Sequence, residues 1–99
     1  MHDIDVSRSL AGVDLNLLVA LDALLAERSV TRAGARVGLS QSSMSHALAR
    51  LRVLLDAPLL VRTGRGMAPT PRAEALRAPL RRALGELARV LAEEGPFEP

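Results

Sequence analysis

Apolar residues recur along most of the chain at the spacing of an α-helix, which predicts a mainly helical fold. The first such segment covers residues 15–28, and three leucines mark its buried face: Leu18, Leu21 and Leu25. Asp14 stands where its carboxylate can cap the first turn of this helix. The residues before it begin polar and acidic, and we expect residues 1–12 to form a flexible N-terminal tail.

Two further helices follow, joined by a short turn. Thr31 is the expected N-cap of a short helix that ends at Val37, where Gly38 stops it. Ser40 is the expected N-cap of a longer helix over residues 41–55. The buried face of that helix carries apolar residues at helical spacing: Met44, Ala47, Leu48, Leu51 and Leu55. A short helix, a glycine-containing turn and a longer helix form a helix-turn-helix pattern.

A hairpin and a long helix complete the predicted fold. Two short strands, over residues 59–62 and 67–69, flank a glycine-rich turn. Thr70 and Pro71 then open the last helix as an N-cap and an N1 proline, so that this helix covers residues 70–94. The pattern therefore predicts a mainly α domain: a helix-turn-helix and a two-stranded hairpin, followed by a long helix.

The leucines of the last helix keep their helical spacing for five turns, and Pro79 inside it is expected to bend it. This stripe could pack on its own domain. The helix is long for so small a domain, however, and an uncovered leucine stripe would leave a sizeable apolar patch. We therefore expect two such helices to pair in a homodimer. The expected interface residues are Leu76, Leu80, Ala83, Leu84, Leu87 and Leu91.

Composition limits the classes of protein that fit. Ninety-nine residues, 48% of them hydrophobic, are enough for one domain with a modest core. The chain has no cysteine, so it has no disulfide framework and no thiolate site. Residues 1–27 carry one arginine and five acidic residues, whereas residues 28–89 carry twelve arginines and three acidic residues. This basic segment is expected to bind a polyanion, an acidic membrane surface or an acidic partner.

The second helix of the helix-turn-helix carries a stripe of small or hydrogen-bonding residues opposite its buried face: Ser42, Ser45, His46 and Ala49. Such a face can enter a major groove without obstruction, although it is also typical of an ordinary solvated helix. Gln41 stands at the helix N-terminus, where free N–H groups favour a phosphate. Arg62 and Arg65 lie around the glycine-rich turn, and an arginine at such a tip can enter a minor groove. Together these features favour DNA as the partner.

An enzyme is poorly supported by the residues. His2 and His46 are the only histidines in the sequence, and they do not have metal-ligand spacing. Ser45 and His46 are adjacent on a helix and point in different directions, so they cannot form a nucleophile–base pair. The alternative to DNA binding is a helical dimerisation or protein-interaction module whose basic face binds an acidic partner. We expect no membrane partner, because a membrane-surface helix needs bulky apolar anchors.

Residues 14–77 resemble the N-terminal DNA-binding region of LysR-type transcriptional regulators. The resemblance is carried by SVTRAGARVGLSQSSMSHALARLR, followed by PLLVRTGRGMAPTPRAEAL. It implies a winged helix-turn-helix over residues 13–69 that binds DNA and a linker helix that pairs two subunits on an interrupted palindrome. The expected DNA-contact residues are Thr31, Arg32, Ser40, Gln41, Ser42, Ser43, Ser45, His46, Arg50, Arg62, Arg65 and Thr70.

The sequence departs from the family's pattern at three places. Gly34 stands where alanine is usual, which costs up to about 1 kcal/mol of helix stability unless close packing needs a glycine. The stretch Ser42-Ser43-Met44 replaces the more usual proline-containing start of the recognition helix. His46 stands where arginine is frequent, and a neutral imidazole attracts phosphate less than a guanidinium does.

Members of this family continue into a larger effector-binding domain, so residues 95–99 are expected to begin the hinge towards it. The resemblance implies a bacterial, cytoplasmic protein that is associated with the nucleoid when it is bound to DNA. It implies no cofactor and no small-molecule effector on this stretch of chain.

Overall fold

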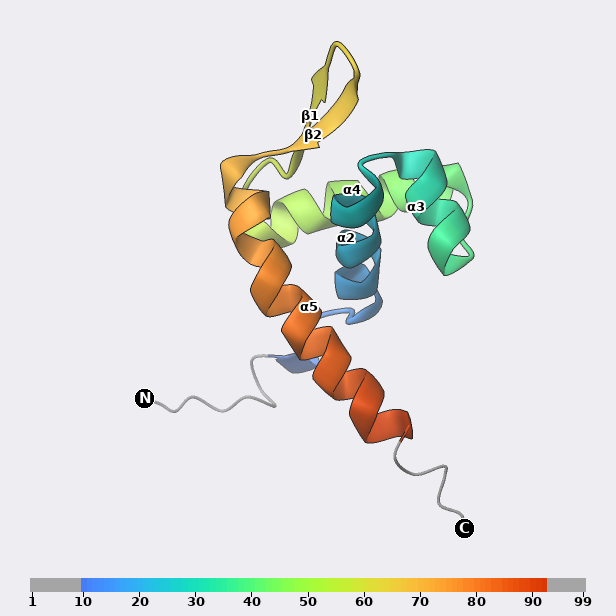
Figure 1. Cartoon of the computed structure of the whole chain (residues 1–99), viewed down its shortest axis with the longest axis vertical. Coiled ribbons are helices and arrows are strands. Elements are labelled where there is room, and N and C mark those ends of the chain that lie inside the picture. The colour runs from blue at the N-terminus through green and yellow to red at the C-terminus, as the bar shows by residue number, and fades with distance from the viewer. Residues whose placement is uncertain (1–9, 93–99) are drawn as a thin grey trace.

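The computed structural model describes residues 10–92. The predicted order of helices and strands is confirmed (Figure 1), with these bounds: α2 (Asn16–Glu27), α3 (Val30–Val37), α4 (Gln41–Leu55), β1 (Leu60–Thr63), β2 (Gly66–Pro69) and α5 (Pro71–Ala92). The predicted hinge at 95–99 and most of the predicted tail at 1–12 lie outside the described residues. Leu10 and Ala11, at the end of that tail, are helical.

The helix α2 lies at the centre of the core and packs against α3, α4 and α5. Apolar side chains from every helix and from the start of β1 meet there. The buried core residues are Leu17, Ala20, Leu21, Ala23, Leu24, Leu25, Ala33, Met44, Ala47, Leu48, Leu51, Leu59, Leu60 and Ala73. Burying aliphatic side chains of this kind contributes about 1.5–3 kcal/mol each, so this cluster is the main stabilising element of the domain. The buried face predicted for α4 is confirmed, except that Leu55 is only partly buried.

The predicted start of α3 is wrong by two residues. Ser29, not Thr31, is the N-cap: its backbone is extended, and its Oγ accepts a hydrogen bond from the N–H of Arg32 at 3.1 Å. Thr31 lies inside the helix and is exposed. The earlier start places Val30 in the first turn, where it packs against the core on the same face as Val37. Both serine and threonine are good caps, so burial of Val30 decides between them.

The other helix boundaries follow the predicted chemistry. Ser40 caps α4 by accepting the N–H of Ser43 at 3.0 Å, and Gly38 ends α3 in the left-handed conformation with φ +77°. The Asp14 carboxylate accepts the N–H of Asn16 at 3.0 Å, although Leu15 is the residue directly before α2. Local side-chain hydrogen bonds thus satisfy backbone N–H groups that the helices themselves leave free.

Gly34 allows a close approach between α3 and the turn that follows it. A Cβ atom at this position would lie 2.5 Å from the backbone oxygen of Leu39 and 3.0 Å from Cγ of Met44. Real Cβ atoms do not come so near a carbonyl oxygen, so a side chain would force the turn to move. Close packing therefore explains the glycine at this helical position.

The wing is the antiparallel pair β1–β2, which projects away from the helices (Figure 1). At its base, the Thr70 hydroxyl donates to the carbonyl oxygen of Pro58 at 2.9 Å and accepts the N–H of Ala73 at 3.2 Å. The predicted cap of the last helix is thereby confirmed, and the same hydroxyl joins the wing to α5. The helix α5 then continues through Pro79 to Ala92 without interruption.

Candidate nucleic-acid interface

The outward face of α4 presents the predicted stripe to solvent. Ser42, Ser45, His46 and Ala49 are exposed, whereas Met44 on the opposite face is fully buried. The buried face fixes how the helix lies on the core, so these four side chains point away from the domain. They are accessible to a partner from outside.

Two of the predicted contact residues, Ser40 and Ser43, also bond to each other. The Ser40 hydroxyl donates to Oγ of Ser43 at 3.1 Å, in addition to accepting its N–H. These serines therefore hold the first turn of α4 in shape. Gln41 and Ser42, between them in the sequence, are exposed at the same helix end. The backbone N–H groups and the helix dipole at this end favour an anion.

The wing and the helix-turn-helix share one open groove of about 310 Å³. It brings together five of the predicted contact residues: Thr31, Arg32, Gln41, Arg62 and Arg65. These residues come from α3, α4 and both ends of the β1–β2 turn region, and only the fold places them side by side. The groove also contains Arg28, which the sequence reasoning missed. Arg28 follows α2 in the left-handed conformation with φ 56°, and nothing in the pattern of the sequence indicates that.

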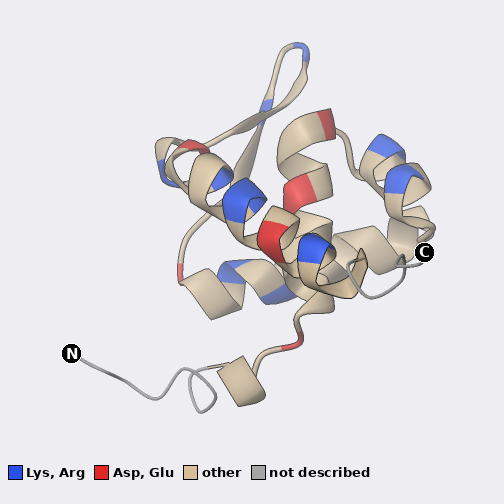
Figure 2. Cartoon of the chain, turned by 60° about the horizontal axis from the view of Figure 1, so that its bottom comes forward, with Lys and Arg blue, Asp and Glu red and all other residues tan. Residues whose placement is uncertain are grey.

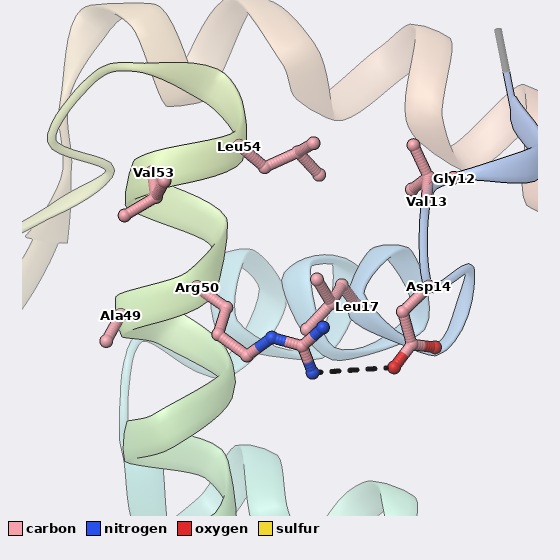
Figure 3. Close-up of a pocket in the computed structure, with 8 residues that line it drawn as sticks. All are labelled: Gly12, Val13, Asp14, Leu17, Ala49, Arg50, Val53 and Leu54. Atoms are coloured by element: carbon pink, nitrogen blue, oxygen red, sulfur yellow. Dashed lines mark ion pairs between the residues drawn. The ribbon is translucent and has the colours of Figure 1, made fainter.

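Three arginines of α3 and α4 are paired with carboxylates. Arg32 donates from Nη2 to the backbone oxygen of Glu27 at 2.9 Å, and its Nε lies 3.6 Å from the Glu27 carboxylate. Arg36 binds the same carboxylate at 3.1 Å. Arg50 lies 3.6 Å from the carboxylate of Asp14 (Figure 3). All three arginine side chains remain at least two-fifths exposed, and such pairs contribute little free energy, so a phosphate can displace the carboxylates.

The charges of the described residues are not evenly distributed over the fold (Figure 2). Basic residues lie on α3, α4, α5 and at the tip of the wing, whereas acidic residues lie mainly on α2 and α5. Residues 10–92 contain no group of three or more histidine, aspartate or glutamate side chains that could hold a metal ion. Over the same range, every helix is too short or too polar to span a lipid bilayer.

An apolar groove of about 410 Å³ lies beside α4 and was not predicted (Figure 3). One wall is formed by α4 and the other by the residues before and at the start of α2; the lining residues are Ala49, Arg50, Val53 and Leu54 on the first and Gly12, Val13, Asp14 and Leu17 on the second. Val53 is 81% exposed and lies on the same outward face of α4 as the polar stripe. The sequence has no distinctive pattern around Val53, so this apolar groove could not be predicted from it.

The predicted interface stripe of α5 divides into two parts. Leu76 and Leu80 are partly buried against the core of their own domain, so packing within the domain accounts for part of the leucine stripe. Further along, Leu87 is 52% exposed, Val90 is 63% exposed and Leu91 is 78% exposed. The second half of α5 therefore presents the uncovered apolar surface, and Val90 belongs to it although it was not among the predicted residues.

A helix-turn-helix with an exposed recognition face, a basic groove and an adjoining hairpin defines a class: the winged helix-turn-helix domain of a DNA-binding transcription regulator. Residues 15–74 match the family model described as "Bacterial regulatory helix-turn-helix protein, lysR family". The chain belongs to the LysR family of bacterial regulatory helix-turn-helix proteins.

Individual relatives agree with this assignment. The chain is 49% identical over 88 residues to nodulation protein D 1 of Bradyrhizobium sp. (strain NC92). This match covers 89% of the chain and 28% of that relative. A probable transcriptional regulator from Pseudomonas aeruginosa has a crystal structure with 46% identity and a TM-score of 0.82, covering 92% of the chain and 30% of the regulator. The chain thus spans less than a third of the length of these relatives.

A third comparison concerns the fold alone. The crystal structure of the CbnR DNA-binding domain in complex with DNA superposes with a TM-score of 0.72 at 23% identity, and the match covers 83% of the chain and 94% of that domain. Nearly all of a separate DNA-binding domain is therefore equivalent in architecture to most of this chain.

Proposed function

We propose that the chain binds specific sites on double-stranded DNA as a homodimer. In this proposal α4 enters the major groove, and the tip of the wing reaches the adjacent minor groove. The observation that carries it is the groove in which Gln41 of α4 meets Arg62 and Arg65 of the wing. A duplex that lies on α4 then passes the wing arginines as well, so one partner satisfies both features.

The residues divide into those that position the protein and those that read bases. Thr31 stands in the first turn of α3, where its exposed hydroxyl suits a phosphate oxygen. Thr70 stands at the N-terminus of α5; its hydroxyl is already bonded to Pro58 and Ala73, so the first-turn backbone of that helix would face the phosphate. Ser45 and His46 face outward from the middle of α4, where they can contact base edges. Arg65 at the wing tip suits the negative potential of a narrow minor groove.

Dimerisation supplies the second half-site. The exposed half of α5 is apolar at Leu87, Val90 and Leu91, and a second copy would cover it. A two-fold dimer presents two α4 helices to successive major grooves, which reads an interrupted palindrome. The alternative, a protein-interaction module with a basic face, explains the charges of the groove but does not require an exposed α4 stripe beside it.

Selection of bound duplexes from a randomised DNA pool at moderate salt tests the proposal. We expect enrichment of a site with two-fold symmetry. If DNA is retained but no sequence is enriched, specific recognition is rejected, and the chain binds only the phosphate backbone. Loss of all DNA even at low salt would reject DNA binding and favour the interaction module. An Arg62→Ala, Arg65→Ala double variant is the control, because it should retain less DNA while α4 remains intact.

We further propose that the chain acts in the bacterial cytoplasm, at the nucleoid when it is bound to DNA. The described residues form a DNA-reading surface and an uncovered helix face, and we assign no cofactor or effector to them.

A further inference from the structure

The turn at the tip of the wing has an unusual backbone. Gly64 and Arg65 connect the paired residues Thr63 and Gly66. Tight two-residue hairpin turns normally have positive φ at one or both loop residues, because that twist matches the strands. Here neither Gly64 nor Arg65 has positive φ, and the positive value is that of Gly66, +127°. The twist of the strands therefore does not by itself favour this loop.

The Thr63 side chain bridges the turn from one end to the other. Its hydroxyl donates to the carbonyl oxygen of Gly66 at 3.2 Å. The Thr63 hydroxyl oxygen in turn accepts the backbone N–H of Arg65 at 3.3 Å. Within residues 10–92, no other side chain forms a hydrogen bond to the backbone of this turn. One hydroxyl thus fixes the peptide from which the Arg65 side chain projects.

The position of that peptide decides where the guanidinium group can reach. Arg65 is exposed at the tip of a two-stranded hairpin, so side-chain packing does little to orient it. A long side chain on a loosely held loop loses more conformational entropy when it is ordered by a ligand. A loop that already holds its bound shape avoids part of that loss.

We propose that Thr63 is a positioning residue for DNA recognition: its hydroxyl holds the wing turn so that Arg65 is presented to the minor groove. This inference rests on the proposed function, in which Arg65 contacts DNA. It assigns Thr63 an effect that operates through Arg65 and not through a DNA contact of its own.

A double-mutant cycle tests the assignment with the whole chain. Thr63→Val keeps the β-branched shape and the strand propensity but removes both hydrogen bonds. The affinity for the enriched duplex is measured as a function of salt for the wild type, Thr63→Val, Arg65→Ala and the double variant. Thr63→Ser, which restores the hydroxyl, is the matched control, and thermal unfolding of each variant shows that the domain is folded.

We expect Arg65→Ala to weaken binding about tenfold, which is typical of losing a hydrogen bond to a charged group, and to make the salt dependence less steep. Thr63→Val should reproduce a large part of both changes. In the Arg65→Ala background it should change the affinity less than about twofold, since the residue it positions is gone. Thr63→Ser should bind like the wild type.

Three results would overturn the assignment. Wild-type affinity for Thr63→Val would show that the hydroxyl is dispensable. An equal loss in the presence and absence of Arg65 would show that Thr63 acts by itself. Weak binding by Thr63→Ser, which keeps the hydroxyl, would show that the loss of affinity comes from a changed side-chain shape and not from the missing hydrogen bonds. These results differ from failure of the proposed function, in which the wild-type chain itself selects no site from the DNA pool.

Discussion

The start of α3 offers a sharp test, because two neighbouring hydroxyl residues compete as its cap. In the structure the Ser29 Oγ accepts the N–H of Arg32 at 3.1 Å, and Thr31 is an exposed residue inside the helix. Replacing each residue by alanine should therefore change stability in opposite directions. Both variants lose one hydroxyl, but only the Ser29 hydroxyl caps the helix in the structure.

The magnitudes follow from these positions. Ser29→Ala removes the N-cap bond, which costs about 1 kcal/mol of the free energy of unfolding. The guanidinium of Arg32 still binds the backbone oxygen of Glu27, so the helix remains attached and the cost should not exceed that value by much. Thr31→Ala replaces a β-branched residue in a helix by the best helix former and should stabilise the domain by a few tenths of a kcal/mol.

Urea unfolding, followed by far-UV circular dichroism without DNA, measures both effects. Protein concentration is held constant, because the stability of a dimer depends on it. For a slope of about 1–2 kcal/mol per molar urea, Ser29→Ala should lower the midpoint by roughly 0.5–1 M. Ser29→Asp keeps a capping oxygen and should retain the wild-type midpoint. A larger loss for Thr31→Ala than for Ser29→Ala would refute the assigned helix start.

Three further predictions concern packing, assembly and specificity. Gly34→Val should lower the free energy of unfolding by about 1–3 kcal/mol, because the valine Cβ would meet the backbone oxygen of Leu39. Ala35→Val, at an exposed position of the same helix, should cost only about a few tenths of a kcal/mol, and equal losses in urea titrations would contradict this prediction. Leu87→Glu should give monomers in light scattering while Ala75→Glu stays dimeric, and a dimeric Leu87→Glu would show that this stripe is not the interface. His46→Ala should change the bases enriched from a randomised duplex pool, and an unchanged site would exclude base reading by this residue.

The sequence carried enough information for the order of elements, because each depends on local chemistry. Ser40 with the apolar spacing after it predicts α4, and Thr70 with Pro71 predicts α5; the structure confirms both caps. The start of α3 was not decidable in the same way. It depends on whether Val30 is buried, which is a property of the assembled core and not of the local pattern.

In the candidate site, too, local features could be predicted and features that depend on the tertiary structure could not. The outward stripe of α4 follows from helical periodicity, so it could be predicted residue by residue. The groove between Gln41 and the wing could not be predicted in this way. Gln41 is more than twenty positions from Arg62 and Arg65 in the sequence, and only the fold brings them together. Pairing of Arg32 and Arg50 with acidic residues was also missed. Their partners, Glu27 and Asp14, belong to a segment that charge counting treated as separate.

Two ion pairs connect α2 and the residue that follows it to α5. Asp22 of α2 lies 3.6 Å from Arg81, and Glu74 of α5 lies 3.7 Å from Arg28. The Thr70 hydroxyl adds a third contact, because it joins the first turn of α5 to Pro58 at the base of the wing. Each ion pair is exposed and weak by itself, but the three contacts limit the direction in which α5 leaves the domain. In a dimer joined through α5, that direction sets the distance between the two recognition helices. Asp22 belongs to the acidic N-terminal segment, so under the proposed function this segment would contribute to recognition through geometry although its charge does not suit DNA.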